Sequence, residues 1–230
     1  MSPADTLHHA RAQLGTWLTL LAELVETNTH ADNQDGIARC HALLKPRLDA
    51  LGLDVERVSA QGTSPRDPGR VLTRRHLLAR TPVKAGRPTV LLMGHLDTVF
   101  PVDHPFQRLE RRGDEWRGPG VSDMKGGIVT ALFTLHLLRE AGRFEDANWR
   151  LILASDEEQG SPTALPVLER AAQGVDLALC FEAARPCGGI VKARKGYGSA
   201  RIRVRGTSGH AGIAHDTGVN ALSALAQFLV

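Results

Sequence analysis

The segment TVLLMGHLD, residues 89–97, joins an aliphatic run to His95 and Asp97, and the chain repeats this pattern twice. WRLILASDEE, residues 149–158, ends in Glu157 and Glu158, and VDLALCFEA, residues 175–183, places Glu182 after its aliphatic run. The segments between these runs have helical character. Continuous apolar strands that alternate with helices form parallel sheets covered on both faces. We therefore predict an α/β fold with a mostly parallel sheet and helices on both faces.

The amino-terminal region predicts two helices and two further strands. Apolar residues at helical spacing predict an amphipathic helix from Leu14 to Val25. A second helix follows, which Pro46 should end or kink and Gly52 should cap. Beyond it we expect a short strand at residues 53–58, a loop at 59–70 and an edge strand at 71–80.

The character of the sequence changes after Gly189. In ARIRVRG, residues 200–206, small or apolar residues alternate with arginines, which predicts a half-exposed strand. Residues 220–230 then begin an apolar helix.

Composition excludes several classes of protein. With 42% hydrophobic and 23% charged residues, the 230-residue chain belongs to the globular class. Its three excess positive charges are not clustered, which argues against a nucleic-acid partner. Residues 1–28 show no basic region followed by a continuous apolar block, so we expect no signal peptide. No apolar run approaches the ~18 residues of a membrane span. The three cysteines, Cys40, Cys180 and Cys187, form no CxxC pair and leave one over, so we expect a reducing compartment. Together with the lack of a membrane span, this predicts a cytoplasmic protein without a membrane partner.

The acidic run SDEE, residues 155–158, brings three carboxylates together, and their negative charge needs compensation. Carboxylates a few ångströms apart repel by about 1 kcal/mol in water and about 4 kcal/mol in a protein cleft. Either these acids point into solvent at a strand end, or a cation lies among them. His95 and Asp97, two residues apart on an extended segment, project to the same side, as suits a metal-binding histidine supported by a carboxylate.

A further acid, Asp123, lies in the glycine-rich segment GPGVSDMKGG. One interpretation is a helix N-cap at Ser122 or Asp123. The density of glycine also indicates a close backbone approach to another group. A nucleotide site is disfavoured, because the P-loop pattern G-x-x-x-x-G-K-[ST] is absent.

Histidine with several carboxylates and no thiolate suits Zn²⁺ in a hydrolytic site, with Co²⁺ or Mn²⁺ as substitutes. The potential ligands His95, Asp123, Glu158 and Glu182, with Glu157 adjacent, exceed what one catalytic zinc uses. Two metals bridged by a carboxylate and a water would use them all.

Five motifs in order, GHLDTVFP, GPGVSDMKGG, ASDEEQGS, FEAARP and KARKGYGSARIRVRGTSGHAG, closely resemble a family of co-catalytic zinc peptidases. That family includes glutamate carboxypeptidase (carboxypeptidase G type), acetylornithine deacetylase, succinyl-diaminopimelate desuccinylase and aminoacylase. The glutamate carboxypeptidase branch is the nearest in these motifs.

The resemblance implies a role for each residue. It implies that His95 and Glu182 hold one zinc, that Glu158 holds the other and that Asp123 bridges both. Glu157 would be the general base, taking a proton from the bridging water and passing it to the leaving amine. The remaining implied features are that Asp97 orients His95, that a cis peptide joins Asp123 to Met124, and that His210, in a lid domain, reaches the partner subunit's site and stabilises the oxyanion.

At the level of the whole protein, the resemblance implies a zinc-exopeptidase-like catalytic domain at residues 1–192 and the start of an α+β lid or dimerisation domain at 193–230. The expected reaction is hydrolysis of a peptide or N-acyl amide bond next to a free carboxylate, by a homodimer. The substrate would be a small peptide or an N-acyl amino acid.

Two departures from the family qualify this expectation. No histidine here fits the family's last ligand, and the usual Glu-Pro is Glu182-Ala183. We therefore expect the amino-terminal part of a longer enzyme, nearly inactive alone. The alternative is a non-catalytic zinc-binding or interaction module.

Overall fold

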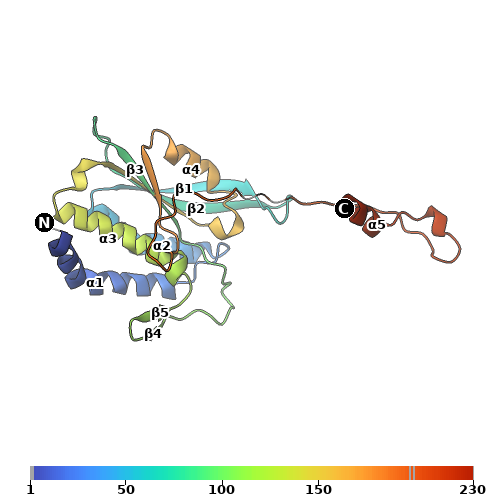
Figure 1. Cartoon of the computed structure of the whole chain (residues 1–230), viewed down its shortest axis with the longest axis horizontal. Helices are drawn as coiled ribbons and strands as arrows, with labels where there is room; N and C mark the ends of the chain where they lie inside the picture. Colours follow the sequence, from blue (N-terminus) through green and yellow to red (C-terminus); the bar gives the residue numbers. More distant parts are fainter. Residues whose placement is uncertain (1–2, 197, 199, 230) are drawn as a thin grey trace. The chain divides into compact units, whose positions relative to one another are not determined.

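In a computed structural model, residues 3–196, 198 and 200–229 are described, and the chain divides into two compact units, Met1–Gly189 and Ile190–Val230. The first unit carries nearly all of the regular structure (Figure 1). Its helices are α1 (Pro3–Glu26), α2 (Gln34–Ala50), α3 (Gly126–Glu140) and α4 (Leu165–Ala172), and its strands are β1 (Asp54–Thr63), β2 (Val71–Arg80), β3 (Thr89–His95), β4 (Glu110–Arg112), β5 (Glu115–Arg117), β6 (Asn148–Ala154) and β7 (Leu177–Cys180). Short helical turns lie at Val121–Lys125, Phe144–Asp146 and Glu157–Gln159.

The main sheet has five strands in the order β1-β2-β6-β3-β7, and β4 pairs with β5 separately. Strand β3 runs parallel to β6 and to β7, whereas β1, β2 and β6 pair antiparallel. The α/β fold is thus confirmed, with a mixed sheet. The three predicted central strands are the parallel ones.

The prediction that residues 71–80 form an edge strand is wrong. Strand β2 lies between β1 and β6. The short strand expected at 53–58 extends to Thr63, and it covers the outer side of β2 in a ten-residue register from Asp54–Arg80 to Thr63–Val71. Because β1 supplies this whole row of hydrogen-bonding partners, β2 becomes interior.

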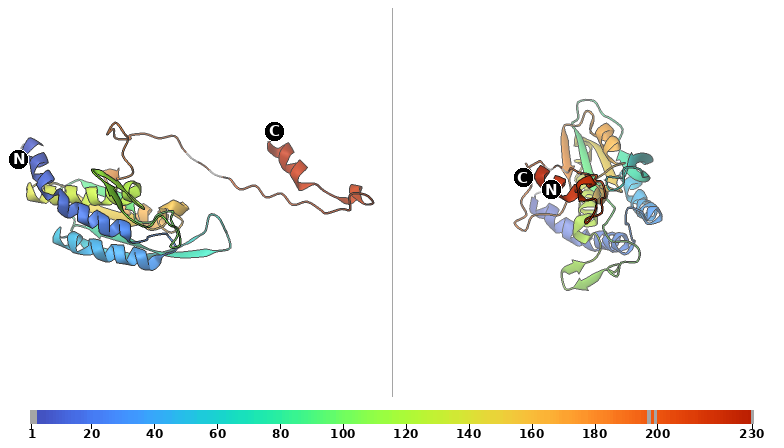
Figure 2. Two further views of the ribbon diagram at one scale, coloured as in Figure 1. Left: turned by 90° about the horizontal axis from the view of Figure 1, so that it is seen from below. Right: turned by 90° about the vertical axis from the view of Figure 1, so that its right-hand side faces the viewer.

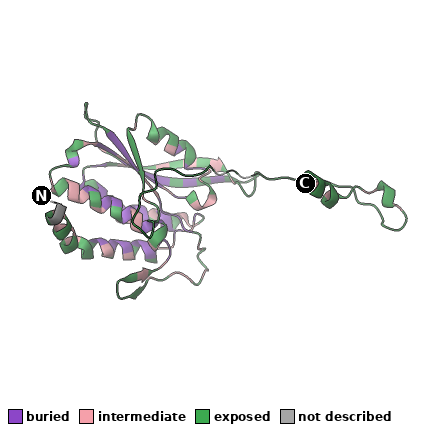
Figure 3. Cartoon of the chain, viewed as in Figure 1, coloured by how far each residue is buried: buried purple, intermediate pink, exposed green. Residues whose placement is uncertain are grey.

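Helices cover both faces of the sheet, as predicted. On one face a large core joins α1, α2 and α3 to inward residues of β2, β3 and β6. Figure 3 shows the buried sides of these helices turned toward the sheet, and Figure 2 shows the layers from two other directions. On the other face Val167 of α4 packs on Leu91 and Ile152.

Helix α1 buries most of its predicted apolar face, because Trp17, Leu21, Leu24 and Val25 are buried, whereas Leu14 at the predicted start is 44% exposed. The ring of Trp17 stacks on Phe133 of α3 at 5.1 Å between centroids. These contacts fix α1 against the helix that follows the Asp123 loop.

Of the two outcomes predicted for Pro46, the end of the helix is wrong, because α2 continues through this residue. It continues to Ala50, because Leu48 and the following Leu51 are buried in the core. Gly52 has a positive φ of 69°, the left-handed conformation expected of the residue that follows a helix.

Strand β7 differs from the buried central strand that its apolar run predicted. All four of its residues are exposed, with Leu177 at 50% and Leu179 at 38%. In the described part of the sheet β7 pairs with β3 alone, so it forms an edge.

The second unit contains a helical turn at His215–Thr217 and α5 (Ala221–Leu229). The strand predicted at residues 200–206 is wrong. Within the described residues this segment has no strand partner, and the nearby pairing is one isolated bridge, Thr207 to Val219. Tyr197, Ser199 and Val230, which belong to the predicted motif and helix, lie outside the described residues.

Across the described residues, no helix combines the length and the apolar character that crossing a membrane requires.

The burial of His41 makes the stability of the fold depend on pH. Its side chain is 1% exposed, and neither ring nitrogen has a hydrogen-bond partner among the described residues. Burial, with the nearby charges of Arg57, His76 and Arg75, lowers the pKa of His41 to about 4. The unfolded chain therefore binds this proton more readily, so the stabilisation is complete above about pH 6.5 and is lost as the pH falls toward 4.

We expect protonation linked to His41 to lower the free energy of unfolding by about 2 kcal/mol when the pH falls from 7 to 5. Urea unfolding at both pH values should show this loss in the wild type but not in His41→Gln. The exposed His8→Gln variant should behave as the wild type does. An unchanged pH dependence in His41→Gln would contradict the prediction.

Candidate metal centre

The predicted residues meet at the carboxyl ends of the parallel strands, where ligands bind in such sheets. His95 is the last residue of β3, Glu157 and Glu158 form the turn after β6, and Glu182 follows β7. Asp123 joins them from the turn before α3. The strand order β6-β3-β7 places His95 between the two acidic ends.

His95 is held from behind by Asp97. The Nδ1 atom of His95 lies 3.0 Å from the backbone oxygen of Asp97 and 3.4 Å from its Oδ1. Asp97 is fully buried, and its Oδ2 accepts a 2.9 Å hydrogen bond from the backbone N–H of Glu158. One carboxylate thus fixes the histidine ring and ties the end of β3 to the turn after β6.

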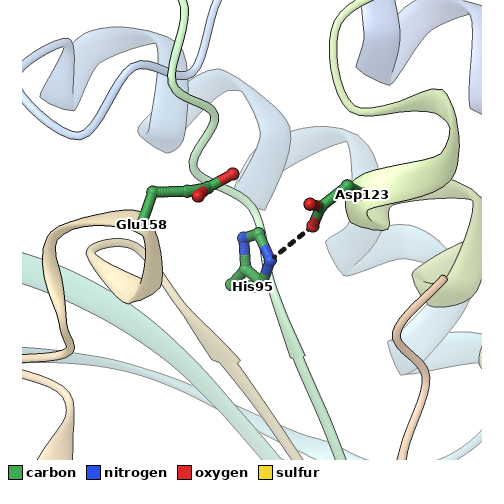
Figure 4. A group of neighbouring side chains, drawn as sticks. All are labelled: His95, Asp123 and Glu158. Carbon is green, nitrogen blue, oxygen red and sulfur yellow. Dashed lines mark hydrogen bonds and ion pairs between the residues drawn. The ribbon is translucent and has the colours of Figure 1, made fainter. Parts of the chain in front are cut away.

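The other ring nitrogen of His95 faces the acids. Its Nε2 lies 3.1 Å from Asp123 Oδ1, 3.6 Å from Glu182 Oε1 and 3.8 Å from Glu157 Oε2. One ligand atom each from His95, Asp123 and Glu158 lie within 4.8 Å of one another, and Figure 4 shows these side chains converging. Imidazole nitrogen and carboxylate oxygen are the donors that Zn²⁺ binds, so the residues fit a metal.

Glu182 lies outside that three-residue group, although its carboxylate reaches His95. The two glutamates of SDEE stand at partly exposed positions, whereas Asp156 is fully buried. Asp156 Oδ2 accepts hydrogen bonds from the backbone and hydroxyl of Thr163, at 2.8 and 2.6 Å. The three consecutive acids therefore divide into one structural residue and two that face the site.

The charges of this cluster shift its protonation. Burial lowers the pKa of His95, but the hydrogen bond to Asp97 and the charges of Asp97, Glu157 and Glu182 outweigh it and raise that pKa to about 9. Burial, followed by the charge of Asp123, raises the pKa of Glu158 to about 7. Burial also raises the pKa of Glu157. The acids hold more negative charge than His95 balances, which favours a cation.

The glycines around Asp123 admit neighbouring backbone. A Cβ on Gly127 would lie 1.8 Å from the backbone oxygen of Phe181, and one on Gly126 would lie 2.3 Å from that of Val121. The close approach at Gly127 is therefore to Phe181, the residue between the end of β7 and Glu182. The peptide bond from Asp123 to Met124 is cis, as the resemblance implied. The interpretation of Ser122 or Asp123 as a helix N-cap is wrong. The N-cap positions are Gly120 for this turn and Lys125 for α3, and neither makes a side-chain capping hydrogen bond.

Lys125, which the sequence did not single out, anchors this loop. It is fully buried, and its Nζ donates to the backbone oxygens of Leu24 and Thr27 at 2.8 and 3.0 Å. Burial lowers the pKa of Lys125 to about 8. The ammonium thus joins the Asp123 turn to the carboxyl end of α1. No charge pattern signals this role, because a lone lysine beside glycines usually lies in solvent.

His210 belongs to the second unit, where its Nδ1 accepts a 3.1 Å hydrogen bond from the backbone of Gly212. Its predicted role concerns a partner subunit and stays a prediction.

Comparison with known proteins identifies the family of the chain. Residues 91–227 match the family described as peptidase family M20/M25/M40, which is more than half of the chain. The chain belongs to this peptidase family. The resemblance inferred from the five motifs is thereby confirmed.

Two curated relatives of the family illustrate the match. The chain is 31% identical over 207 residues to carboxypeptidase G2 of Pseudomonas sp. (strain RS-16), covering 88% of this chain and 47% of that protein. It is 27% identical over 219 residues to a probable succinyl-diaminopimelate desuccinylase of Staphylococcus aureus (strain Mu50 / ATCC 700699), covering 92% and 50%. The chain spans about half the length of these relatives.

Among solved structures, human carnosine dipeptidase 1 superimposes with a TM-score of 0.66 at 21% identity, covering 79% of this chain and 41% of that one. This similarity shows the α/β fold.

Proposed function

We propose that the protein is, or forms the amino-terminal part of, a metal-dependent hydrolase that cleaves a peptide or N-acyl amide bond next to a free carboxylate. The observation that carries the proposal is the convergence of His95, Asp123 and Glu158 within 4.8 Å at the ends of parallel strands. Membership of the M20/M25/M40 family supports it. So do relatives named as a carboxypeptidase and a desuccinylase.

The residues present would hold two divalent cations, with zinc preferred and Co²⁺ or Mn²⁺ as substitutes. His95 and Glu182 would bind one ion and Glu158 the other, with Asp123 shared between them. When bound, the metals would polarise the scissile carbonyl and make water a better nucleophile at neutral pH.

The protein's own side chains would position groups and move the proton. Asp97 holds Nδ1 of His95 and so keeps Nε2 turned toward the acids. Glu157 lies beside the three-residue group with 49% of its side chain exposed, so a substrate and a water can both reach it. Its carboxylate would take a proton from that water and pass it to the leaving amine.

His210 extends the proposal to the full assembly. It would stabilise the oxyanion in a partner subunit, in a homodimer formed through a lid domain that begins near residue 193. Both statements rest on the family resemblance.

Metal-reconstituted turnover tests the function. The longest protein that contains this sequence would be used, because residues 1–230 alone are expected to be nearly inactive. It would be stripped with a chelator, reloaded with Zn²⁺, Co²⁺ or Mn²⁺, and assayed on N-acyl amino acids and dipeptides, each with a free or an amidated carboxyl end. We expect hydrolysis that requires metal and prefers the free carboxylate. Stoichiometric metal binding without hydrolysis of any substrate would instead support a non-catalytic zinc-binding module.

A further inference from the structure

The Glu157–Gln159 turn, which carries the two glutamates of the site, is followed by a loop with a strained backbone. Gly160 and Ser161 both have a positive φ, of 88° and 56°, and Ser161 is not a glycine. A residue with a side chain keeps such a φ only where the surrounding structure holds it there. The conformation of the turn therefore depends on contacts that restrain the loop.

Asp156 supplies these contacts. Its backbone oxygen accepts hydrogen bonds from the backbone N–H groups of Gln159 and Ser161, at 3.2 and 2.8 Å. Its buried carboxylate reaches Thr163 beyond the loop, where Oδ2 accepts from the backbone N–H at 2.8 Å and from Oγ1 at 2.6 Å. The loop is thereby tied to the residue that directly precedes Glu157.

His76 of β2 fixes the direction of the Thr163 hydroxyl. Burial lowers the pKa of His76, which favours a neutral ring at pH 7. Its Nδ1 accepts the backbone N–H of Ser155 at 3.3 Å, so the proton of the neutral ring lies on Nε2. Nε2 lies 3.0 Å from Oγ1 of Thr163 and therefore donates to it. The single hydroxyl proton of Thr163 is then directed to Asp156.

The hydrogen bonds thus run in one direction, from His76 to Thr163 to Asp156. All three side chains are fully buried, so water does not compete for their polar atoms. A buried carboxylate is costly unless hydrogen bonds satisfy it, which makes the Thr163 hydroxyl important to the position of Asp156.

This chain also connects the turn to β2. The pairing of β2 with β6 extends as far as Leu77–Leu153, and beyond that pair the side chain of His76 joins β2 to the residues that follow β6. From the other side, Asp97 after β3 accepts the backbone N–H of Glu158. Because β6 lies between β2 and β3, the turn is held from both strands that flank it.

We propose that His76 and Thr163 are positioning residues that orient the Glu157–Gln159 turn toward the metal centre. They act through Asp156, and neither is a proposed ligand or base. The inference rests on the proposed function. Small displacements matter here, because moving a catalytic group by about 1 Å costs about a hundredfold in rate, and loss of a group that supports a metal ligand costs about 10- to 100-fold in affinity.

Two substitutions of Thr163 test the inference in the longest protein that contains this sequence. Thr163→Val keeps the shape of the side chain but removes the hydroxyl, whereas Thr163→Ser keeps the hydroxyl. We expect Thr163→Val to weaken Zn²⁺ binding about tenfold, to change the absorption spectrum of the Co²⁺-loaded protein and to lower kcat at least tenfold. Thr163→Ser should retain wild-type values for all three.

His76 provides an independent pair of variants. His76→Gln keeps an N–H group that can reach Thr163, and His76→Leu removes it. We expect zinc affinity near that of the wild type in His76→Gln and about tenfold weaker binding in His76→Leu. The control is Thr134→Val, which removes a hydroxyl from an exposed position of α3 and should leave affinity and spectrum unchanged.

Urea unfolding of the metal-free variants separates positioning from folding. If the hydrogen bonds serve stability alone, Thr163→Val will be less stable, but its folded form will keep the wild-type zinc affinity and Co²⁺ spectrum. That result would overturn the inference, and so would a Thr163→Ser protein as impaired as Thr163→Val. If Thr163→Val does not fold, equal zinc affinities in the two His76 variants would refute it.

The metal measurements also distinguish this inference from the proposed function. A wild-type protein that binds zinc but hydrolyses no substrate would contradict the proposed function, while the zinc affinities of the variants would still decide whether His76 and Thr163 position the turn.

Discussion

Replacing Glu157 with glutamine is expected to lower kcat for N-acyl amino acid hydrolysis by about a thousandfold, while metal binding persists. General-base catalysis contributes about 10² to 10⁴ in rate, and an amide of the same shape cannot accept the proton. Glu157 lies 3.8 Å from Nε2 of His95 but outside the three-residue metal-binding group. Its loss should therefore affect proton transfer rather than metal binding.

Steady-state kinetics and elemental analysis of the same preparation would measure the two effects separately. Glu169→Gln, an exposed acid on α4, is the matched control and should leave kcat unchanged. A Glu157→Gln enzyme within tenfold of wild type, with its metals bound, would exclude this residue as the base.

Replacing Asp123 with alanine should have a different consequence, the loss of metal itself. Asp123 is the acid nearest to Nε2 of His95, and it is the residue we propose to be shared by both ions. Because removing supporting residues of a metal site costs about 10- to 100-fold in affinity, loss of a shared ligand should weaken zinc binding at least a hundredfold. Turnover at limiting zinc should fall in parallel.

The fold should survive this change, because 61% of the Asp123 side chain is exposed. Calorimetric titration with Zn²⁺ would report the affinity, and urea unfolding of the metal-free protein would confirm that stability is retained. Asp114→Ala, in the exposed β4–β5 turn, provides the control. Zinc affinity within a few-fold of wild type in Asp123→Ala would remove Asp123 from the proposed ligands.

The two variants separate the components of the proposal. Loss of catalysis with metal retained, in Glu157→Gln, tests the base, and loss of metal with the fold retained, in Asp123→Ala, tests the ligand set. A protein that merely binds zinc would show the second effect without the first.

The sequence located the site because His95, the SDEE glutamates and Glu182 each follow an apolar run, and Asp123 stands in a glycine-rich loop before a helix. The ends of parallel strands lie at one edge of a sheet, so residues far apart in the chain could be assigned to one place. The same reasoning failed for β2, because whether a strand is interior depends on a partner. The extent of β1, beyond its predicted six residues, was the deciding fact.

Residues 200–206 show the same limit. Their alternating pattern suits a strand, yet a strand forms only against another hydrogen-bonding edge, and the described part of that unit offers none there. A local pattern indicates which secondary structure a segment can adopt, whereas pairing with another strand decides whether a strand forms.

The sequence by itself determined the family and the α/β class and placed histidine and acids at the strand ends, because these depend on local periodicity and on motifs in a fixed order. The tertiary structure alone decided which of the consecutive acids face the candidate site. Asp156 turns inward to Thr163 while Glu157 and Glu158 face the site. It also decided that Lys125 anchors the Asp123 turn. The Lys125 contacts join segments about a hundred residues apart in the chain, and no local pattern encodes them.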